Sequence, residues 1–130
     1  MSYQTNITIE TDANDHFRKV LFTGKKSQLV VMNIPPGGEI GEETHDHVEQ
    51  TLYFQSGNGM AILNNAESAV GAGDVLVVTP GTKHNIKNTG TDPLKIATVY
   101  APPNHIDGRV HHTKADADAD AEDEEFGHAT

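Results

Sequence analysis

Histidine is the residue type in this sequence best suited to chemistry, because it is the commonest protein metal ligand and it titrates near neutral pH. The 130-residue chain contains eight histidines and no cysteine. Two of them, His45 and His47, are separated by one residue. Side chains at i and i+2 of an extended strand point to the same face, so this pair can direct two imidazoles at one point. Two surface histidines on a loop would give the same pattern, and the pair alone does not decide between these readings.

A third histidine, His84, follows a predicted buried strand over residues 75–79 that is stopped by Pro80-Gly81. If Ile86 faces the interior, His84 does as well, because the two are separated by one residue. A single inward histidine is more often a hydrogen-bonded core residue than a ligand. Three histidines that can meet inside one barrel favour a metal site, so we predict that His45, His47 and His84 bind one divalent metal ion.

The elements that would position these histidines read as strands. Short apolar runs alternate with turn signals at roughly ten-residue spacing, which is typical of a β-sandwich or β-barrel. No amphipathic helix is predicted before residue 114. The sequence therefore predicts an all-β protein with strands over residues 7–10, 17–23, 28–34, 52–54, 60–63, 75–79, 84–87 and 94–100.

Two segments resemble the paired motifs of the cupin superfamily. The second motif is G-x5-P-x-G-x2-H-x3-N. Gly73, Gly81, His84 and Asn88 match it in register, and Thr79 stands in place of the proline. The first motif, G-x5-H-x-H-x(3,4)-E-x6-G, is matched by His45, His47 and Gly57, and Glu39 stands at the position of its leading glycine. The resemblance covers residues 28–103. It implies an antiparallel jelly-roll barrel, also called a double-stranded β-helix.

The chain also resembles a subgroup of short, single-domain cupins that are described as similar to mannose-6-phosphate isomerase. These proteins carry H-x3-D/E-Q in the first motif and end with Tyr-Ala-Pro-Pro-x-His-x-Asp-Gly-x-x-His. Residues 45–50 and 100–111 match both patterns. The resemblance implies an isomerase-like activity, but a shared fold and metal motif are a weak guide to substrate.

Two neighbouring residues, Glu49 and Gln50, compete to be the fourth metal ligand. Alternation from His45 places Glu49 on the ligand face. Gln50 instead shares the parity of Leu52 and Phe54, which should face the core, and the count back from Gly57 in the cupin motif also selects Gln50. We predict Gln50, with an irregularity near Val48. Imidazole and oxygen ligands suit iron, manganese, nickel, cobalt or zinc, and the sequence does not choose among these metals.

Three functions are compatible with such a site. The first is a metal-dependent isomerase or epimerase on a small polar metabolite such as a sugar, with Glu49 as the general base because it is the acid closest to the ligands. The second is a metal-dependent dioxygenase. The third is a non-catalytic module that binds or senses a small molecule.

The charge of the chain is concentrated at its C-terminal end. The chain has 19 acidic and 9 basic residues, a net charge of −10, and residues 114–130 hold seven of the acids and one lysine. We predict a cupin domain over residues 1–112 and a dispensable, largely disordered tail over residues 113–130. The histidines just before it, His105, His111 and His112, are expected to dock the C-terminal segment or to face water.

The same composition limits the partners. An acidic surface disfavours nucleic acid and anionic membranes. No run approaches the roughly 20 apolar residues of a membrane span, and no signal peptide is visible at the N-terminus, so we expect a cytoplasmic protein. Small cupins commonly pair by sheet edges, and the resemblance therefore implies a homodimer, with residues 7–22 as the interface.

Overall fold

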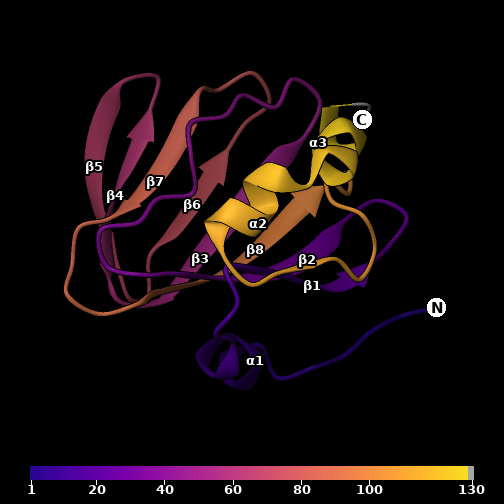
Figure 1. Cartoon of the computed structure of the whole chain (residues 1–130), viewed down its shortest axis with the longest axis horizontal. Coiled ribbons are helices and arrows are strands. Elements are labelled where there is room, and N and C mark those ends of the chain that lie inside the picture. Colours follow the sequence, from indigo (N-terminus) through magenta and orange to yellow (C-terminus); the bar gives the residue numbers. More distant parts are fainter. Residues whose placement is uncertain (129–130) are drawn as a thin grey trace.

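Two antiparallel sheets that face each other form the body of the protein, whose computed structural model describes residues 1–128 (Figure 1). The larger sheet has, in order, β6 (Val75–Val78), β3 (Glu49–Ser56), β8 (Leu94–Ala101), β2 (Gln28–Ile34), β1 (Arg18–Thr23) and β9 (Val110–His111). The smaller has β5 (Ala66–Gly71), β4 (Asn58–Leu63) and β7 (His84–Asn88). The predicted all-β architecture is confirmed.

The core lies between the two sheets and follows from alternation along the strands. On β2 the inward side chains are Val30, Met32 and Ile34, and on β3 they include Leu52 and Phe54; all five are fully buried. Each such side chain stabilises the fold by about 1.5–3 kcal/mol. Cross-strand pairing of β2 and β3 with β8 brings these rows together at the centre of the larger sheet.

One buried polar residue of the core, Gln28, ties the end of the barrel to the chain that follows it. Its amide nitrogen donates to the His105 carbonyl oxygen at 2.7 Å, and its amide oxygen accepts from the backbone N–H groups of Asn104 and His105. A buried amide whose donor and acceptor are both satisfied fixes the geometry of its partners. Gln28 therefore sets the position of His105.

Two strand predictions were wrong in detail. Strand β5 was missed because its side chains are mostly exposed and form no apolar run; it pairs with β4 through a hairpin whose two loop residues, Asn64 and Asn65, have positive φ. Strand β6 is not buried on both faces. It lies at the edge of its sheet, where Val75 is 63% and Val77 is 51% exposed.

The N-terminal run over residues 7–10 is a helix and not the predicted strand. Helix α1 (Ile7–Ala13) is capped by Asn6, whose side-chain oxygen accepts from the Ile9 N–H at 3.0 Å. The helix packs on the outer face of the larger sheet, below β1 in Figure 1, and Lys95 of β8 donates to the carbonyl of Asp12. The N-cap and this tertiary contact outweigh the strand propensity of the isoleucines.

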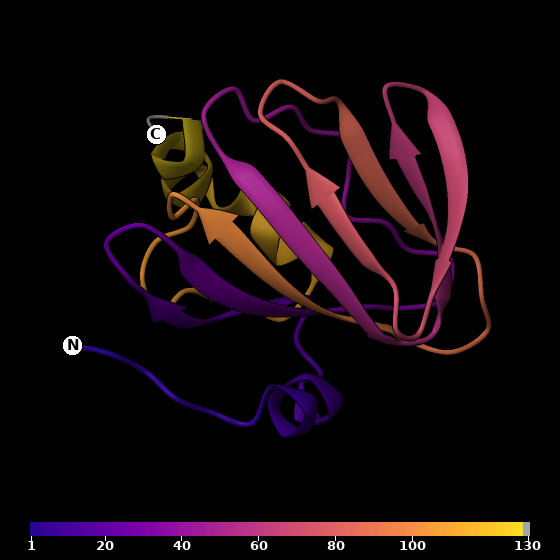
Figure 2. The same cartoon turned by 180° about the vertical axis from the view of Figure 1, so that it is seen from behind.

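Residues 114–128 of the predicted tail are mostly helical, so the prediction of a largely disordered tail was wrong for this part; residues 129–130 of that prediction lie outside the described residues. The helical part forms α2 (Lys114–Ala119), capped by Thr113, and α3 (Ala121–His128). Both helices lie in front of β8 in Figure 1 and behind it in Figure 2. None of the helices within residues 1–128 has the length and hydropathy needed to cross a bilayer.

Candidate metal site and adjoining cavity

Two of the three predicted metal-binding histidines come together. The rings of His45 and His84 lie 5.3 Å apart between their centroids. Backbone hydrogen bonds explain this approach, because Glu43 and His84 exchange N–H···O bonds of 2.9 Å in both directions and the Gly81 N–H donates to the His45 carbonyl. The loop that carries His45 is thus held against the first residue of β7.

The buried ring of His84 has one nitrogen in use. Its Nδ1 lies 2.9 Å from the carbonyl oxygen of Thr82. A carbonyl can only accept, so Nδ1 carries the proton in this bond and Nε2 of the neutral ring keeps its lone pair. Burial lowers the pKa of His84, the bond to Thr82 opposes that shift, and the charge of nearby His45 adds to it. A neutral imidazole with a fixed tautomer is the form that binds a metal.

The ring of His45 is held by a carboxylate. Its Nε2 lies 3.1 Å from a carboxylate oxygen of Glu43, whose side chain is half exposed. Burial raises the pKa of the Glu43 carboxyl, but its hydrogen bond to His45 and the charges of His45 and Arg18 outweigh burial and hold that pKa below its ordinary value. Glu43 therefore stays ionised beside His45.

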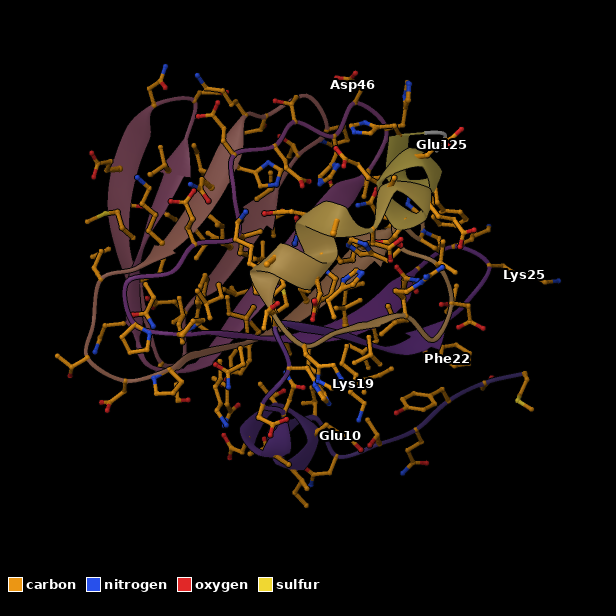
Figure 3. The ribbon with its side chains drawn as sticks, in the orientation of Figure 1. Glu10, Lys19, Phe22, Lys25, Asp46 and Glu125 are labelled. Carbon is orange, nitrogen blue, oxygen red and sulfur yellow. The ribbon has the colours of Figure 1, made fainter. Side chains whose placement is uncertain are left out.

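His47 does not join this pair. Asp46 and His47 form a bend, and strand β3 begins only at Glu49, so the assumption that His45 and His47 lie on one strand was wrong. The side chain of His47 is exposed. Figure 3 shows Asp46 at the tip of this bend, at the same end of the molecule as Glu125 of α3. Burial of Val48 turns the chain after the bend and leaves His47 outside.

Gln50 and Glu49 face opposite sides of β3. Gln50 is 3% exposed, and its Nε2 donates to Thr98 Oγ1 at 3.1 Å, while Thr98 in turn donates to the Thr51 carbonyl. Glu49 is exposed. The parity argument that placed Gln50 inside is confirmed, whereas its role as a ligand stays a prediction. The structure does not bring Glu49, the predicted general base, to the histidines, because its side chain lies on the outer face.

A cavity of about 90 Å³ adjoins His45 and Glu43. Its other walls come from β1, the segment after β8 and the two C-terminal helices, and it is lined in part by Arg18, Asn104, His105, Asp118, Asp123 and Glu124. Tyr100 stands between the histidines, with its ring 6.4 Å from that of His45 and 4.9 Å from that of His105. Burial raises the pKa of Tyr100 to about 12, so it remains a neutral phenol.

The C-terminal helices are anchored by carboxylate–imidazole pairs. Asp123 Oδ2 lies 2.8 Å from His105 Nδ1, and Asp123 Oδ1 accepts from the Ile106 N–H at 2.7 Å. Asp120 Oδ2 lies 2.9 Å from His111 Nε2 and 3.3 Å from a guanidinium nitrogen of Arg109. The expectation that His105 and His111 dock the C-terminal segment is confirmed. The third, His112, is exposed.

A second group of possible metal ligands lies at this anchor. The ligand atoms of His111, Asp120 and Asp123 all lie within 4.8 Å of one another, a test that His45, His47 and His84 do not meet within residues 1–128. The carboxylates of this group are already engaged by histidine, arginine and backbone donors, and the Arg109 cation beside Asp120 would repel a metal ion. This group was not predicted from the sequence because its two acids lie in the low-complexity tail, and only its single histidine, His111, carried a signal.

Comparison with known proteins identifies the fold. The cupin domain model matches residues 30–100. The uncharacterized protein YrkC of Bacillus subtilis is 42% identical over 127 residues, which cover 93% of this chain and 68% of YrkC. A crystal structure from Bacillus halodurans, BH2720, has 38% identity and a TM-score of 0.90, with coverage of 92% of this chain and 95% of that one.

A more distant relative carries a functional name. The oxalate-binding protein of Thermotoga maritima is 32% identical over 68 residues, 52% of this chain and 56% of that protein. The match to the cupin domain model and the TM-score of 0.90 agree with the antiparallel jelly roll. The chain belongs to the cupin family.

Proposed function

We propose that the protein binds one divalent metal ion at His45, His84 and Gln50, with His47 as a further ligand, and that it acts on a small polar metabolite in the manner of an isomerase. The observation that carries this proposal is the 5.3 Å approach of the His45 and His84 rings. Their segments match the two cupin motifs, and the fixed Nδ1 of His84 leaves its Nε2 for a metal.

The donor set fits a metal in part. Two imidazoles already converge and Gln50 is buried with its amide nitrogen bonded to Thr98. His47 stands on the exposed bend, so its participation requires that this bend turn inward. Three neutral imidazoles and an amide oxygen would leave a divalent ion its full charge, and such an ion supplies Lewis-acid chemistry at a substrate carbonyl.

The resemblance to mannose-6-phosphate isomerase-like cupins supports a sugar-like substrate. What the chain's own residues contribute is orientation: Glu43 holds the His45 ring, and Thr82 holds the His84 ring. Because Glu49 lies on the outer face, we do not assign it as the base of the reaction.

Non-catalytic binding of a small molecule is the second candidate. It is favoured by the name of the Thermotoga maritima relative, an oxalate-binding protein that this chain matches over 52% of its length. A dioxygenase would require a redox metal, so a preparation loaded with iron would favour that third reading, and zinc would disfavour it.

The metal content of purified wild type and of His84→Ala tests the site. We expect one equivalent in the wild type. We expect the affinity of His84→Ala to fall by more than about 100-fold, because loss of only an outer partner of a metal-binding histidine costs about 10–100-fold. Lys83→Ala is the matched control and should retain the metal. A full equivalent bound by His84→Ala with unchanged affinity would overturn the proposal.

We also propose that the protein is a homodimer, through a different surface from the one expected from the sequence. Strand β1 is paired on both sides, with β2 and β9, and so offers no free edge. The outer face beside the sheet edge instead exposes four apolar side chains on β6, β3 and β8: Val75, Val77, Tyr53 and Val99. Contiguous exposed apolar residues mark interaction surfaces.

Sedimentation analysis distinguishes the two surfaces. Val77→Glu should convert the dimer to a monomer without loss of the fold, because a charge on the exposed face disturbs nothing buried. Ile9→Glu, on the exposed side of α1, is the control for the surface predicted from the sequence. A wild type that sediments as a monomer at high concentration would refute the proposal.

A further inference from the structure

Three side chains that line the cavity carry a buried polar atom without a hydrogen-bond partner within residues 1–128. They are Arg18 Nε, Asn104 Oδ1 and His105 Nε2. The residues are 7%, 3% and 7% exposed. A buried polar atom without a partner costs about 1–3 kcal/mol, so three beside one cavity point to a ligand that satisfies them.

The contacts of His105 determine what its free nitrogen can do. Its Nδ1 lies 2.8 Å from Asp123. Burial raises the pKa of Asp123, but the hydrogen bonds from His105 and from the Ile106 N–H and the charge of Arg18 outweigh burial, so this pKa is lowered. Burial lowers the pKa of His105 as well, with the Asp123 bond opposing. An ionised Asp123 accepts the Nδ1–H of a neutral ring, which leaves Nε2 as an acceptor. Arg18 Nε–H, in contrast, can only donate.

The charges around the cavity exclude one class of ligand. Four acidic side chains line it, Glu43, Asp118, Asp123 and Glu124, against the single guanidinium of Arg18. The groups that face His105 are Asp123 from α3, Arg18 from β1, Tyr100 from β8 and Glu43 from the loop before β3. This surplus of negative charge disfavours a carboxylate or a phosphate. An ionised carboxylate, in addition, has no proton to offer His105 Nε2.

We propose that the cavity binds the hydroxyl-bearing end of a neutral polyhydroxy compound, with a hydroxyl oxygen accepting from Arg18 and a hydroxyl proton donated to His105. A hydroxyl group both donates and accepts, which is the combination the unpartnered atoms require. The volume of about 90 Å³ suits one end of such a molecule, since a water molecule occupies about 30 Å³ of liquid. The proposal deepens the proposed function, and rests on it only in placing the rest of the ligand beside His45.

In this arrangement the C-terminal helix α3 is part of the binding site. Asp123 is a positioning residue, because it fixes the His105 tautomer and does not itself need to touch the ligand. Gln28 fixes the backbone of the same residue through hydrogen bonds to the His105 N–H and carbonyl oxygen. The tail is therefore not dispensable for binding at this cavity.

Nitrogen-15 NMR of the histidine rings tests the proposal on the full chain. In the free protein His105 should show a protonated Nδ1 and an unprotonated Nε2. Titration with neutral D-ribose, D-xylose or D-glucose should shift the His105 Nε2 resonance in a saturable manner, whereas oxalate and inorganic phosphate should not. Stronger binding of oxalate or phosphate than of the sugars, or no saturable shift with any sugar, would overturn the proposal.

Matched variants separate positioning from charge. Asp123→Asn should populate the other His105 tautomer and weaken sugar binding at least about tenfold, a change of 1.4 kcal/mol. Glu125→Gln removes a charge of the same sign from the exposed side of α3. It should leave the His105 tautomer and the affinity for the sugar unchanged. Arg18→Gln should weaken binding without altering the tautomer; if Asp123→Asn fails to fold, this variant carries the test. Unchanged affinity in the folded variants would refute the assignment.

Failure of the proposed hydroxyl-binding cavity can be distinguished from failure of the proposed metal site. To do so, metal content and the sugar-dependent NMR shift are both measured on the zinc-loaded and on the chelated protein. The subsite residues Arg18, His105 and Asp123 are not proposed metal ligands, so their variants should keep the metal content of the wild type. A wild type that binds no metal but shows the sugar-dependent His105 shift would refute the proposed metal site and retain the subsite. A wild type that binds zinc but shows no sugar-dependent shift of His105 would retain the proposed metal site and refute the hydroxyl-binding subsite.

Discussion

The histidines of the two cupin motifs and those that precede the tail are the same residue type in different electrostatic settings. His84 is fixed by a neutral carbonyl and approaches another imidazole. His105 and His111 are each paired with an aspartate at 2.8–2.9 Å. A carbonyl fixes a ring but leaves it neutral and able to bind a cation, whereas a paired carboxylate supplies its own countercharge. His45 combines the two settings, because its ring approaches that of His84 and also lies 3.1 Å from the Glu43 carboxylate. A carboxylate partner is therefore compatible with metal binding as well as with docking.

The two regions are also stabilised by different interactions. The barrel is stabilised by buried aliphatic and aromatic side chains such as Phe54 and Ile96. The tail contributes little apolar area: Phe126 is 38% exposed, although Ala117 packs against the core. Its attachment depends on Asp120 and Asp123. The tail's docking should therefore be sensitive to pH and to single polar substitutions, and the barrel should be less so.

The largest expected effect comes from removal of the tail. A chain that ends at Thr113 should lose about 2–4 kcal/mol in free energy of unfolding, because hydrogen bonds to charged groups contribute about 1.5–3 kcal/mol each and the ordering of the tail offsets part of their sum. Denaturant unfolding followed by circular dichroism measures this loss. Unchanged stability would restore the expectation of a dispensable tail and would mean that these pairs contribute nothing net.

Asp123→Ala should lower the free energy of unfolding by a smaller amount, about 1–3 kcal/mol. The substitution removes the partner of both His105 and the Ile106 N–H. Its cost cannot exceed that of deleting the tail, because the tail can detach and expose these groups to water. Glu125→Ala, which changes an exposed acid of the same helix, should stay within about 0.5 kcal/mol. Equal losses for both variants would indicate a general charge effect.

The stability that the tail adds should depend on pH. The pKa of His105 is lowered in the folded protein, so the unfolded chain binds the proton more readily, and this contribution is complete above about pH 6.5 and falls as the pH decreases toward the folded-state value. The pKa of Asp123 is also lowered, so its contribution is lost in turn below about pH 4.

The full chain and the chain ending at Thr113 should be compared by denaturant unfolding across this range. The difference between them isolates the tail from other titrating groups such as His84. We expect the difference to shrink as the pH decreases. A difference that grows on acidification would mean that protonated His105 binds Asp123 more strongly than the neutral ring does.

Much of the barrel could be predicted from the sequence because its strands carry strong local signals. β2 begins and ends where the apolar run 28–34 does, and β7 and β8 differ from their predictions by one residue. Local sequence patterns failed to predict the elements that depend on tertiary contacts. Helix α1 depends on a single cap and on packing against the sheet, and strand β5 has no apolar pattern.

The candidate site was predicted only in part. The motif spacing identified His45, His84 and the inward position of Gln50, but the bend at Asp46-His47 has no signature that distinguishes it from an extended strand. The pairing of His105 with Asp123 joins residues 18 positions apart in a segment whose composition indicates disorder. An argument from apolar area alone could not find it, because the contact is polar and depends on the folded barrel.

The smallest expected effect is the difference in stability and metal affinity between the Gln50→Ala and Glu49→Ala variants. Gln50→Ala removes the donor to Thr98 and should cost about 1 kcal/mol in stability, in addition to weakening any metal bound at His45 and His84. Glu49→Ala changes an exposed side chain on the outer face and should stay within about 0.5 kcal/mol, with metal affinity unchanged. Thermal unfolding with and without the metal measures both quantities. If Glu49→Ala weakened metal binding more than Gln50→Ala did, then β3 would have to rotate its first residues inward on metal binding. His47 would move with them, because it lies only two residues before Glu49.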